Sequence, residues 1–187
     1  MPTFETKDLT LGDLQVSSKG AKQFPLNDRE EPLLWKPGPL HVLWQPSAFK
    51  DPEASRVTIC FSSTPEVESY LHDLESWVLK TVASAPKKFF GVDLTQSQVQ
   101  EKYSPVVKVS QKGYAHIKAK MNIAGKNSVR CWDAETRAQK KQPEDWTMCE
   151  VQPSFHVKGV WVMNKDFGIL IEMTDALTIE RSNICPF

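Results

Sequence analysis

The chain has 187 residues and a formal net charge of zero, from 23 basic and 23 acidic side chains. This length is sufficient for one domain with a sizeable core, and 40% hydrophobic residues exclude a generally disordered chain. No apolar stretch approaches the roughly 18 residues of a membrane-spanning helix. The N-terminus lacks the apolar segment of a secretory signal, and the four cysteines form no Cys-x-x-Cys pair. We therefore expect free thiols in a reducing intracellular compartment.

Residues 1–55 form an arm rich in proline and tryptophan. We expect the part before about residue 31 to be mobile. The apolar groups at 33–35 and 40–44 each contain a tryptophan, and exposed pairs of tryptophans are unusual in monomers. These groups are predicted to pack onto the domain or to form an edge strand. The function of the arm is open, and docking on a second copy of the chain is one interpretation.

A strand followed by a helix is predicted next. Residues 56–61 alternate between polar and apolar side chains, which indicates a strand. Thr64 and Pro65 are typical of a helix start, and apolar residues then recur at helical spacing up to about residue 84. A short second helix is predicted to begin at Thr95, which has a glutamine three residues further on, and to end before the next Ser-Pro pair.

From residue 106 onward the sequence alternates with period two, which is typical of strands. The predicted strands are 106–110, 114–123, 128–132, 154–163 and 167–173, with a continuation near Ile179. The last two are predicted to form a hairpin, and the polar segment 133–153 a long loop. Several strands with one amphipathic helix at the side indicate a mainly β domain, either a partly open barrel or a sandwich.

The segment 102–132 is strongly basic. It contains six lysines and one arginine but no carboxylate, whereas the chain as a whole is 25% charged with balanced signs. A surface normally carries both signs, so this segment is unusual. A polyanion responds to the local potential, because salt screens charges beyond about 8–10 Å. The zero net charge therefore does not exclude nucleic-acid binding.

The strand predicted at 114–123 has two distinct faces. The apolar face, predicted to join the core, carries Ala115, Ile117, Ala119, Met121 and Ile123. The opposite face carries Tyr114, His116, Lys118, Lys120 and Asn122, and Arg130 and Trp132 join it if the strand 128–132 pairs with this one. Cations that contact phosphates, beside flat rings that stack on bases, are what single-stranded nucleic acid requires. The alternative is a solvated face that carries lysine and tyrosine for solubility and strand propensity.

We therefore predict a nucleic-acid-binding surface on this part of the chain. The lysines and Arg130 are expected to contact phosphates, and Tyr114 and Trp132 to stack on bases. Trp146 lies in the polar loop, where it either folds over a bound strand or anchors the loop against the domain. The predicted nucleic-acid-binding residues are Lys108, Lys112, Tyr114, His116, Lys118, Lys120, Lys126, Arg130, Trp132 and Trp146.

Other chemistry has little support in the sequence. The four cysteines and four histidines have no metal-ligand spacing, so neither a metal site nor a cofactor is predicted. No nucleophile elbow, His-Glu-x-x-His motif or cluster of carboxylates is present, and no enzymatic activity is predicted. Only an arrangement of Cys131, Cys149 and His156 around a bound metal would favour an enzyme.

The linear order of these features resembles a known family. The helix VESYLHDLESWVLKTVAS is followed by KFFG, by KYSPVVK, by the basic strand and by a hairpin of the form VKGVWVMNKDFGILIEM. Over about residues 55–180 this is similar to the single-stranded-DNA-binding proteins of the nucleocytoplasmic large DNA viruses. Those proteins are distantly similar to phage replication proteins of the same role.

The resemblance implies an oligonucleotide-binding (OB)-like, partly open barrel at 56–180 with one flanking helix and a short second helix. It also implies a protein that coats single-stranded DNA without strong sequence preference during replication or recombination. Such a protein would lack catalysis and act in a host nucleus or a cytoplasmic viral replication site.

The two ends of the chain depart from this pattern. The tail, 181–187, lacks the acidic residues that usually precede a terminal aromatic in phage and bacterial proteins of this role. Recruitment of replication proteins through Pro186 and Phe187 is therefore only a hypothesis, and the arm has no counterpart. Two other functions stay open. RNA binding would use the same face, since discrimination requires a contact to the 2′-hydroxyl. A β-rich structural or virion-associated protein would use the arm for docking.

Overall fold

The computed structural model describes residues 6–17, 20–48, 50–163 and 165–180. The helices are α1 (Pro65–Ser84), α2 (Pro86–Phe90) and α3 (Gln96–Glu101), with two short 3-10 helices, η1 (Thr6–Asp8) and η2 (Trp146–Met148). The strands are β1 (Leu9–Leu11), β2 (Gln15–Val16), β3 (Lys22–Asp28), β4 (Glu31–Pro32), β5 (Leu34–Trp35), β6 (Leu40–Ser47), β7 (Arg56–Ser62), β8 (Tyr103–Ser104), β9 (Val107–Val109), β10 (Ala115–Asn122), β11 (Arg130–Asp133), β12 (Gln139–Lys140), β13 (Cys149–Met163) and β14 (Asp166–Glu180).

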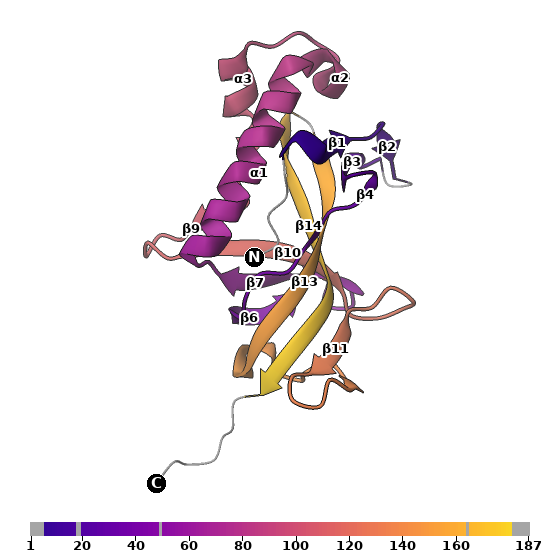
Figure 1. Cartoon of the computed structure of the whole chain (residues 1–187), viewed down its shortest axis with the longest axis vertical. Coiled ribbons are helices and arrows are strands. Elements are labelled where there is room, and N and C mark those ends of the chain that lie inside the picture. Colours follow the sequence, from indigo (N-terminus) through magenta and orange to yellow (C-terminus); the bar gives the residue numbers. More distant parts are fainter. Residues whose placement is uncertain (1–5, 18–19, 49, 164, 181–187) are drawn as a thin grey trace.

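A long hairpin forms the spine of the molecule. The strands β13 and β14 each have 15 residues and pair antiparallel from one end to the other, with Cys149 opposite Glu180 and Met163 opposite Asp166. In Figure 1 this hairpin runs along the length of the elongated molecule. The predicted hairpin is therefore confirmed. Both strands extend further than the sequence indicated, because their alternation of buried and partly exposed side chains continues beyond Pro153 and Met173.

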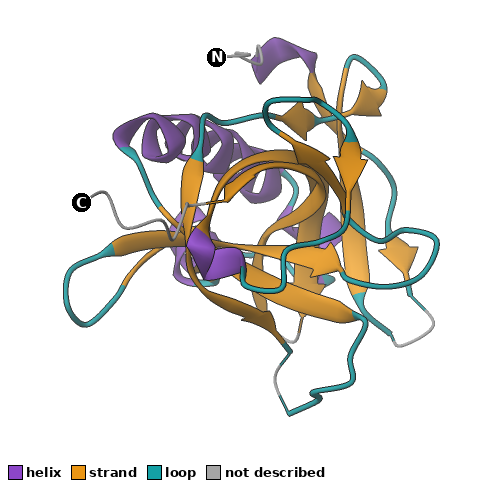
Figure 2. Cartoon of the chain, turned by 90° about the horizontal axis from the view of Figure 1, so that it is seen from below, coloured by secondary structure: helices purple, strands orange, loops and turns teal. Residues whose placement is uncertain are grey.

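A curved sheet closes into a partly open barrel around part of this hairpin, and α1 lies beside the ring of strands (Figure 2). Around the barrel the order is β13, β6, β7, β10 and β14, and the pairing of β14 with β13 completes the circle. Closure matters because an open sheet edge leaves unpaired backbone groups. The fold is thus mainly β and consistent with an OB-like, partly open barrel with a flanking helix, as predicted.

The helix boundaries follow the local sequence. The Thr64 hydroxyl accepts a hydrogen bond from the Val67 N–H at 3.4 Å and caps α1, and Pro65 occupies the first turn. The predicted capping box is present at Thr95, so the start of α3 is confirmed. The sequence prediction ends the helical region at Pro86 and misses α2. Proline also suits the first turn of a new helix, and α2 begins there.

The helix α1 attaches to the barrel through one apolar stripe. Its buried residues recur at helical spacing and are Val67, Tyr70, Leu71, Leu74, Val78 and Val82. Burying a side chain of the size of leucine or valine contributes roughly 1.5–3 kcal/mol each relative to leaving it exposed. The predicted amphipathic helix is therefore confirmed, and the stripe holds it against the core.

The N-terminal arm is part of the sheet. β3 pairs with β13 opposite residues 159–162, β5 pairs with β13 opposite Phe155 and His156, and β6 pairs with both β13 and β7. We expected mobility before about residue 31, but the structure shows β1, β2 and β3 there. The physical reason is that β13 is long enough to pair with three arm segments in turn. A domain boundary at residue 55 stays a prediction.

Trp35 joins the arm to the rest of the core. It is 1% exposed, and its ring lies parallel to that of Tyr70 on α1, with the centroids 4.5 Å apart and an interplanar angle of 5°. The ring centroid of Phe155, on β13, is 5.3 Å from that of Trp35. Trp35 therefore connects the arm to both the helix α1 and the long hairpin. The predicted docking of the group 33–35 is confirmed.

The pairing of β3 with β13 depends on Gly159. This residue lies at a bulge in β13 and has a φ of +138°, a conformation that side chains rarely adopt. A Cβ atom at this position would lie 2.0 Å from the carbonyl oxygen of Phe24 on β3. Glycine is therefore required here both for the backbone conformation and for the close approach of β3.

Replacing Gly159 with alanine is expected to lower the free energy of unfolding by at least about 2 kcal/mol, from backbone strain and overpacking together. Urea unfolding followed by circular dichroism measures this change. Gly38→Ala is the matched control, because no atom lies within 4 Å of a Cβ placed there. Equal stability of the two variants would contradict the account of the bulge.

The polar segment 133–153 is not an extended loop throughout. It contains the short strand β12, the 3-10 helix η2 and the first residues of β13. Its chain turns back after Asp133, whose carboxylate accepts hydrogen bonds from the backbone N–H groups of Glu135 and Thr136. The prediction of a long loop was therefore wrong over these short elements, which sequence alternation is too brief to indicate.

Candidate nucleic-acid interface

Strand pairing places outward-pointing side chains in rows, because side chains at opposite positions of a sheet point to the same side. Four such rows cross the outside of the barrel, and we call this surface the outer face. The rows are Trp44, Cys60 and Lys118; Thr58, Lys120, Glu172 and His156; Arg130, Asp175 and Ser154; and Trp132, Leu177 and Gln152. Cys60 points to this side but is itself fully buried. Basic and aromatic side chains from four strands (β6, β10, β11 and β13) thus share one surface.

The two basic strands do not pair with each other. Both β10 and β11 run parallel to β14 and lie one after the other along the edge of β14 that β13 leaves open. The loop between them therefore carries the chain onward in one direction instead of reversing it. We expected a shared face if the strand 114–123 paired directly with the strand 128–132, but each of the two pairs with β14 instead. Arg130 and Trp132 nevertheless reach the outer face, because β14 connects the two strands.

Most of the predicted cations are exposed. The exposed ones are Lys108, Lys112, Lys118, Lys126 and Arg130. None of these four lysines forms an ion pair within the described part of the chain, so their charges are available to a ligand. Tyr114, the residue just before β10, is 68% exposed. These positions agree with the expected surface.

Two predicted rings are buried instead. His116 is only 8% exposed, because Trp44 from the neighbouring arm strand β6 lies edge-on to its ring with the centroids 6.0 Å apart. Trp146 is 4% exposed in η2, and its backbone N–H donates to the Gln45 side-chain oxygen at 3.3 Å. Trp146 therefore anchors the loop against the barrel, and neither ring is placed to stack on a base.

Lys120 is only partly available. Its ammonium group donates to the Thr58 hydroxyl at 2.7 Å, and the residue is partly buried. Burial lowers the pKa of Lys120, and the nearby charges of Arg56 and Lys118 lower it further. A cation held in this way contributes less to an anion-binding surface than the exposed Lys118 beside it.

Two carboxylates lie among these cations. Both come from β14, and neither belongs to the basic segment 102–132. Glu172 forms an ion pair with Arg56 at 3.0 Å and accepts a hydrogen bond from Asn122. Asp175 pairs with Arg130, with Nε–Oδ1 at 2.8 Å. The outer face is therefore less positive than the sequence of β10 and β11 alone indicates.

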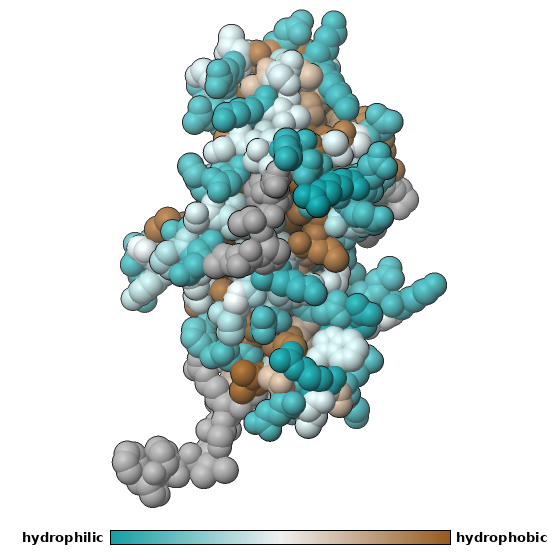
Figure 3. Space-filling view, viewed as in Figure 1, coloured by the Kyte–Doolittle hydropathy of each residue, from teal (hydrophilic) through white to brown (hydrophobic). Residues whose placement is uncertain are grey.

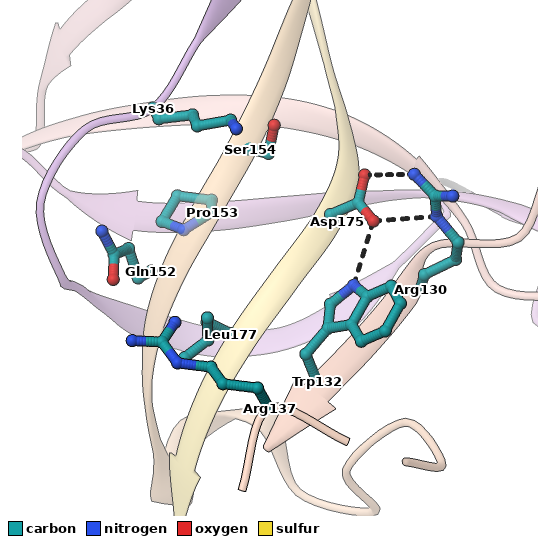
Figure 4. Close-up of a pocket in the computed structure, with 9 residues that line it drawn as sticks. All are labelled: Lys36, Arg130, Trp132, Arg137, Gln152, Pro153, Ser154, Asp175 and Leu177. Atoms are coloured by element: carbon teal, nitrogen blue, oxygen red, sulfur yellow. Dashed lines mark hydrogen bonds and ion pairs between the residues drawn. The ribbon is translucent and has the colours of Figure 1, made fainter. Parts of the chain in front are cut away.

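Asp175 also orients Trp132. Its Oδ1 accepts a hydrogen bond from the Trp132 indole N–H at 3.0 Å, and its Oδ2 accepts one from Arg130 at 2.9 Å (Figure 4). Burial acts to raise the pKa of Asp175, but the hydrogen bonds from Arg130 and Trp132 outweigh this effect and hold the pKa below its usual range. The carboxylate is therefore charged at neutral pH and keeps both side chains in place.

The sequence analysis missed four side chains of this surface. Trp44 is 47% exposed and lies in the same row as Lys118. Lys36 and Arg137 come from the loops after β5 and β11, and Lys158 comes from β13; no ion pair holds any of these three within the described residues. None of these four residues lies in the basic segment 102–132, so the count of charges in that segment did not indicate them. Trp44 was predicted to pack onto the domain or to lie in an edge strand, and nothing in the sequence indicated that its ring stays exposed.

Two hollows of the surface meet at Arg130. The first, of about 410 Å³, is lined by Lys36, Trp132 and Arg137 among others, over a floor formed by β13 and β14 (Figure 4). The second, of about 650 Å³, includes Lys126, His156 and Lys158. Lysine and arginine side chains border both hollows. Hollows bordered by cations suit a phosphate backbone better than a flat neutral sheet does.

Metal or thiol chemistry finds no support at this surface. Among the described residues no group of three or more His, Cys, Asp and Glu side chains is placed to hold a metal ion. Cys60 and Cys131 are buried, and burial raises the pKa of each thiol to about 11. Both thiols are therefore protonated and unreactive at neutral pH.

Figure 3 shows one side of the molecule, which is mostly hydrophilic with scattered hydrophobic patches between the polar residues. None of the helices in the described ranges has both the length and the apolar character needed to cross a bilayer. Pro186 and Phe187, the proposed contact for replication proteins, lie outside the described residues.

No family model and no curated protein matches this sequence. Solved structures are similar in fold. One is the single-stranded DNA-binding protein from bacteriophage Enc34 in complex with ssDNA, at 11% identity and a TM-score of 0.50, covering 94% of this chain and 97% of that chain. A second solved structure of the single-stranded DNA-binding protein from bacteriophage Enc34 is also similar. It has 11% identity and a TM-score of 0.50, and the match covers 95% of this chain and 93% of that chain. The fold that this chain shares is thus that of a phage single-stranded DNA-binding protein.

Proposed function

We propose that this protein binds and coats single-stranded DNA, without strong sequence preference and without catalysis, during replication or recombination. The observation that carries the proposal is the outer face, where the exposed ring of Trp44 and the half-buried ring of Trp132 lie among lysine and arginine side chains, with the exposed ring of Tyr114 just before β10. Rings stack on bases of any sequence, and cations neutralise phosphates. The fold likeness to a phage protein solved with ssDNA supports the same function. We also propose kinship with the large-DNA-virus proteins that the sequence resembles.

The test is quenching of tryptophan fluorescence by an oligo-dT across a salt series, with a matched oligo-rU in parallel. Binding that weakens linearly in log affinity against log salt supports the proposal. Preference for oligo-rU would identify an RNA-binding protein. Self-assembly at high salt with no affinity for either oligonucleotide would instead favour a structural protein that docks through the arm. Oligomerisation through the arm stays a prediction.

Removing the exposed ring of Trp44 is expected to weaken binding even when salt masks the lysines. Stacking of one base contributes roughly 1–3 kcal/mol, so Trp44→Ala should lower the affinity for oligo-dT about 5-fold to 100-fold at high salt. Anisotropy of a labelled oligo-dT measures this without relying on tryptophan. Leu43→Ala, a change at an exposed neighbour on β6, is the control. Unchanged affinity in Trp44→Ala would mean that the ring only covers His116.

Removing the charge of Asp175 is expected to strengthen binding. Asp175→Asn keeps an acceptor for the Trp132 indole but frees Arg130 for a phosphate, so the affinity at low salt should rise about threefold to tenfold. The gain should disappear at high salt. Asp166→Asn, at the exposed start of β14, is the control for a general change of net charge. Weaker binding by Asp175→Asn would show that the carboxylate contributes through the position of Trp132 rather than by opposing the ligand.

A further inference from the structure

Three paired strands, β11, β14 and β13, form the floor of the hollow beside Trp132. Two adjacent outward rows, Arg130–Asp175–Ser154 and Trp132–Leu177–Gln152, cross β11, β14 and β13. The row between them points into the core and seals the floor with Cys131, Ala176 and Pro153, which are all buried. The volume of about 410 Å³ falls within the roughly 300–1,000 Å³ that is usual for small-ligand sites.

Charge converges on this hollow from two loops. In Figure 4 the Lys36 side chain lies at the upper end of the hollow beside Ser154, and the Arg137 side chain extends across β14 at its lower end toward Gln152. The structure gives neither side chain an ion pair within the described ranges, whereas Arg130 is held by Asp175. An anion entering the hollow would therefore meet Lys36 and Arg137 first, because neither must break an existing pair to bind it.

The indole ring of Trp132 lines another side of the hollow, which we call the aromatic wall. Trp132 and Gln152 occupy the same row two strands apart, which is about 10 Å at the usual strand spacing. The indole is oriented by its hydrogen bond to Asp175, so the wall has a fixed position. Gln152 and Ser154 add an amide and a hydroxyl on the floor between the wall and the cations. Each can both donate and accept a hydrogen bond.

We propose that this hollow is a pocket for a single unstacked nucleotide. The base stacks on Trp132, its polar edge meets Gln152 and Ser154, and its 5′-phosphate lies between Lys36 and Arg137. This inference rests on the proposed function, and it adds a site that distinguishes bases at one position of an otherwise sequence-tolerant surface. A pocket of this kind binds a mononucleotide without the rest of the strand, which an extended stacking face alone does not.

The experiment uses the full chain labelled with ¹⁵N in tryptophan. The indole signal of Trp132 is assigned by its loss in Trp132→Phe and is followed during titration with dAMP, dCMP, dGMP or dTMP. We expect each nucleotide to shift this signal with saturation in the millimolar range, with unequal affinities among the four bases. Inorganic phosphate and deoxyribose 5-phosphate, which lack the base, are expected to leave the signal in place.

Three variants test the assigned contacts. Lys36→Ala with Arg137→Ala should weaken mononucleotide binding at least about tenfold, because two charged donors to the phosphate are lost. Lys80→Ala with Lys87→Ala, a double change at exposed lysines of α1 and α2, is the matched control and should leave binding unchanged. Gln152→Ala should narrow the differences among the four bases.

The outcomes separate this inference from the proposed function. A Trp132 signal that no mononucleotide shifts, in a protein that still binds oligo-dT, overturns the pocket and leaves the proposed function in place. Equal shifts with inorganic phosphate also overturn it, because the site then recognises only an anion. Saturable mononucleotide binding in a protein with no affinity for oligo-dT supports the pocket and overturns the proposed function.

Discussion

Lys118→Glu combined with Lys126→Glu is expected to lower the affinity for oligo-dT about 100-fold at low salt. Both side chains are exposed and form no ion pair within the described residues, so the change should leave the fold intact. A hydrogen bond to a charged group contributes roughly 1.5–3 kcal/mol, and two such contacts correspond to at least about 100-fold. The slope of log affinity against log salt should fall by about 1.4, since each phosphate contact on a single strand contributes about 0.7.

The control for this variant is Lys80→Glu with Lys87→Glu, which makes the same change of net charge on the helices. An effect of long-range repulsion alone would weaken both variants equally. The outer face would be rejected as the binding surface if the Lys118 and Lys126 variant kept the affinity and salt slope of the original protein.

The largest expected effect on stability belongs to Trp35→Ala. Removal of a buried tryptophan usually costs about 3–5 kcal/mol, and here it also removes the stacked contact with Tyr70 and the contact with Phe155. The loss should appear as a lower urea midpoint with a single cooperative transition, because the arm, α1 and β13 share this residue. Thermal unfolding followed by near-ultraviolet circular dichroism provides a second measurement.

Leu34→Ala is the matched control, because Leu34 is the preceding residue of the same strand and is 54% exposed. Its replacement should change the free energy of unfolding by less than about 0.5 kcal/mol. If Trp35→Ala were no more damaging than Leu34→Ala, the arm would be a dispensable attachment and not a component of the core.

Local features of the fold were predictable from the sequence because their causes are local. The cap at Thr64 and the capping box at Thr95 depend on residues three positions apart, and both helices begin where the sequence indicates. The apolar face predicted for 114–123 was equally readable, and its residues Ile117 and Met121 are fully buried. Ile123 was predicted to join this face but is 40% exposed, because β10 ends at Asn122. Strand alternation reports which face is buried, but it does not report which strand lies alongside.

The composition of the outer face could not be predicted for that reason. Asp175 and Arg130 are 45 residues apart along the chain, and their ion pair depends on the parallel pairing of β11 with β14. Trp44 reaches Lys118 only because β6 and β10 both pair with β7. Charge counting within 102–132 therefore identified exposed cations such as Lys118 correctly. It missed the carboxylates and rings that distant strands bring to the same surface.

The chain order of the barrel constrains how it can fold. The arm strands β3, β5 and β6 are made first, but they pair with β13, which is made more than 100 residues later. During synthesis on the ribosome, Phe24, Trp35 and Leu40 therefore remain without their final partners until β13 emerges. Contacts of such long sequence separation slow folding and expose apolar segments in the meantime. The nascent arm must therefore be kept from aggregating until β13 has been synthesised.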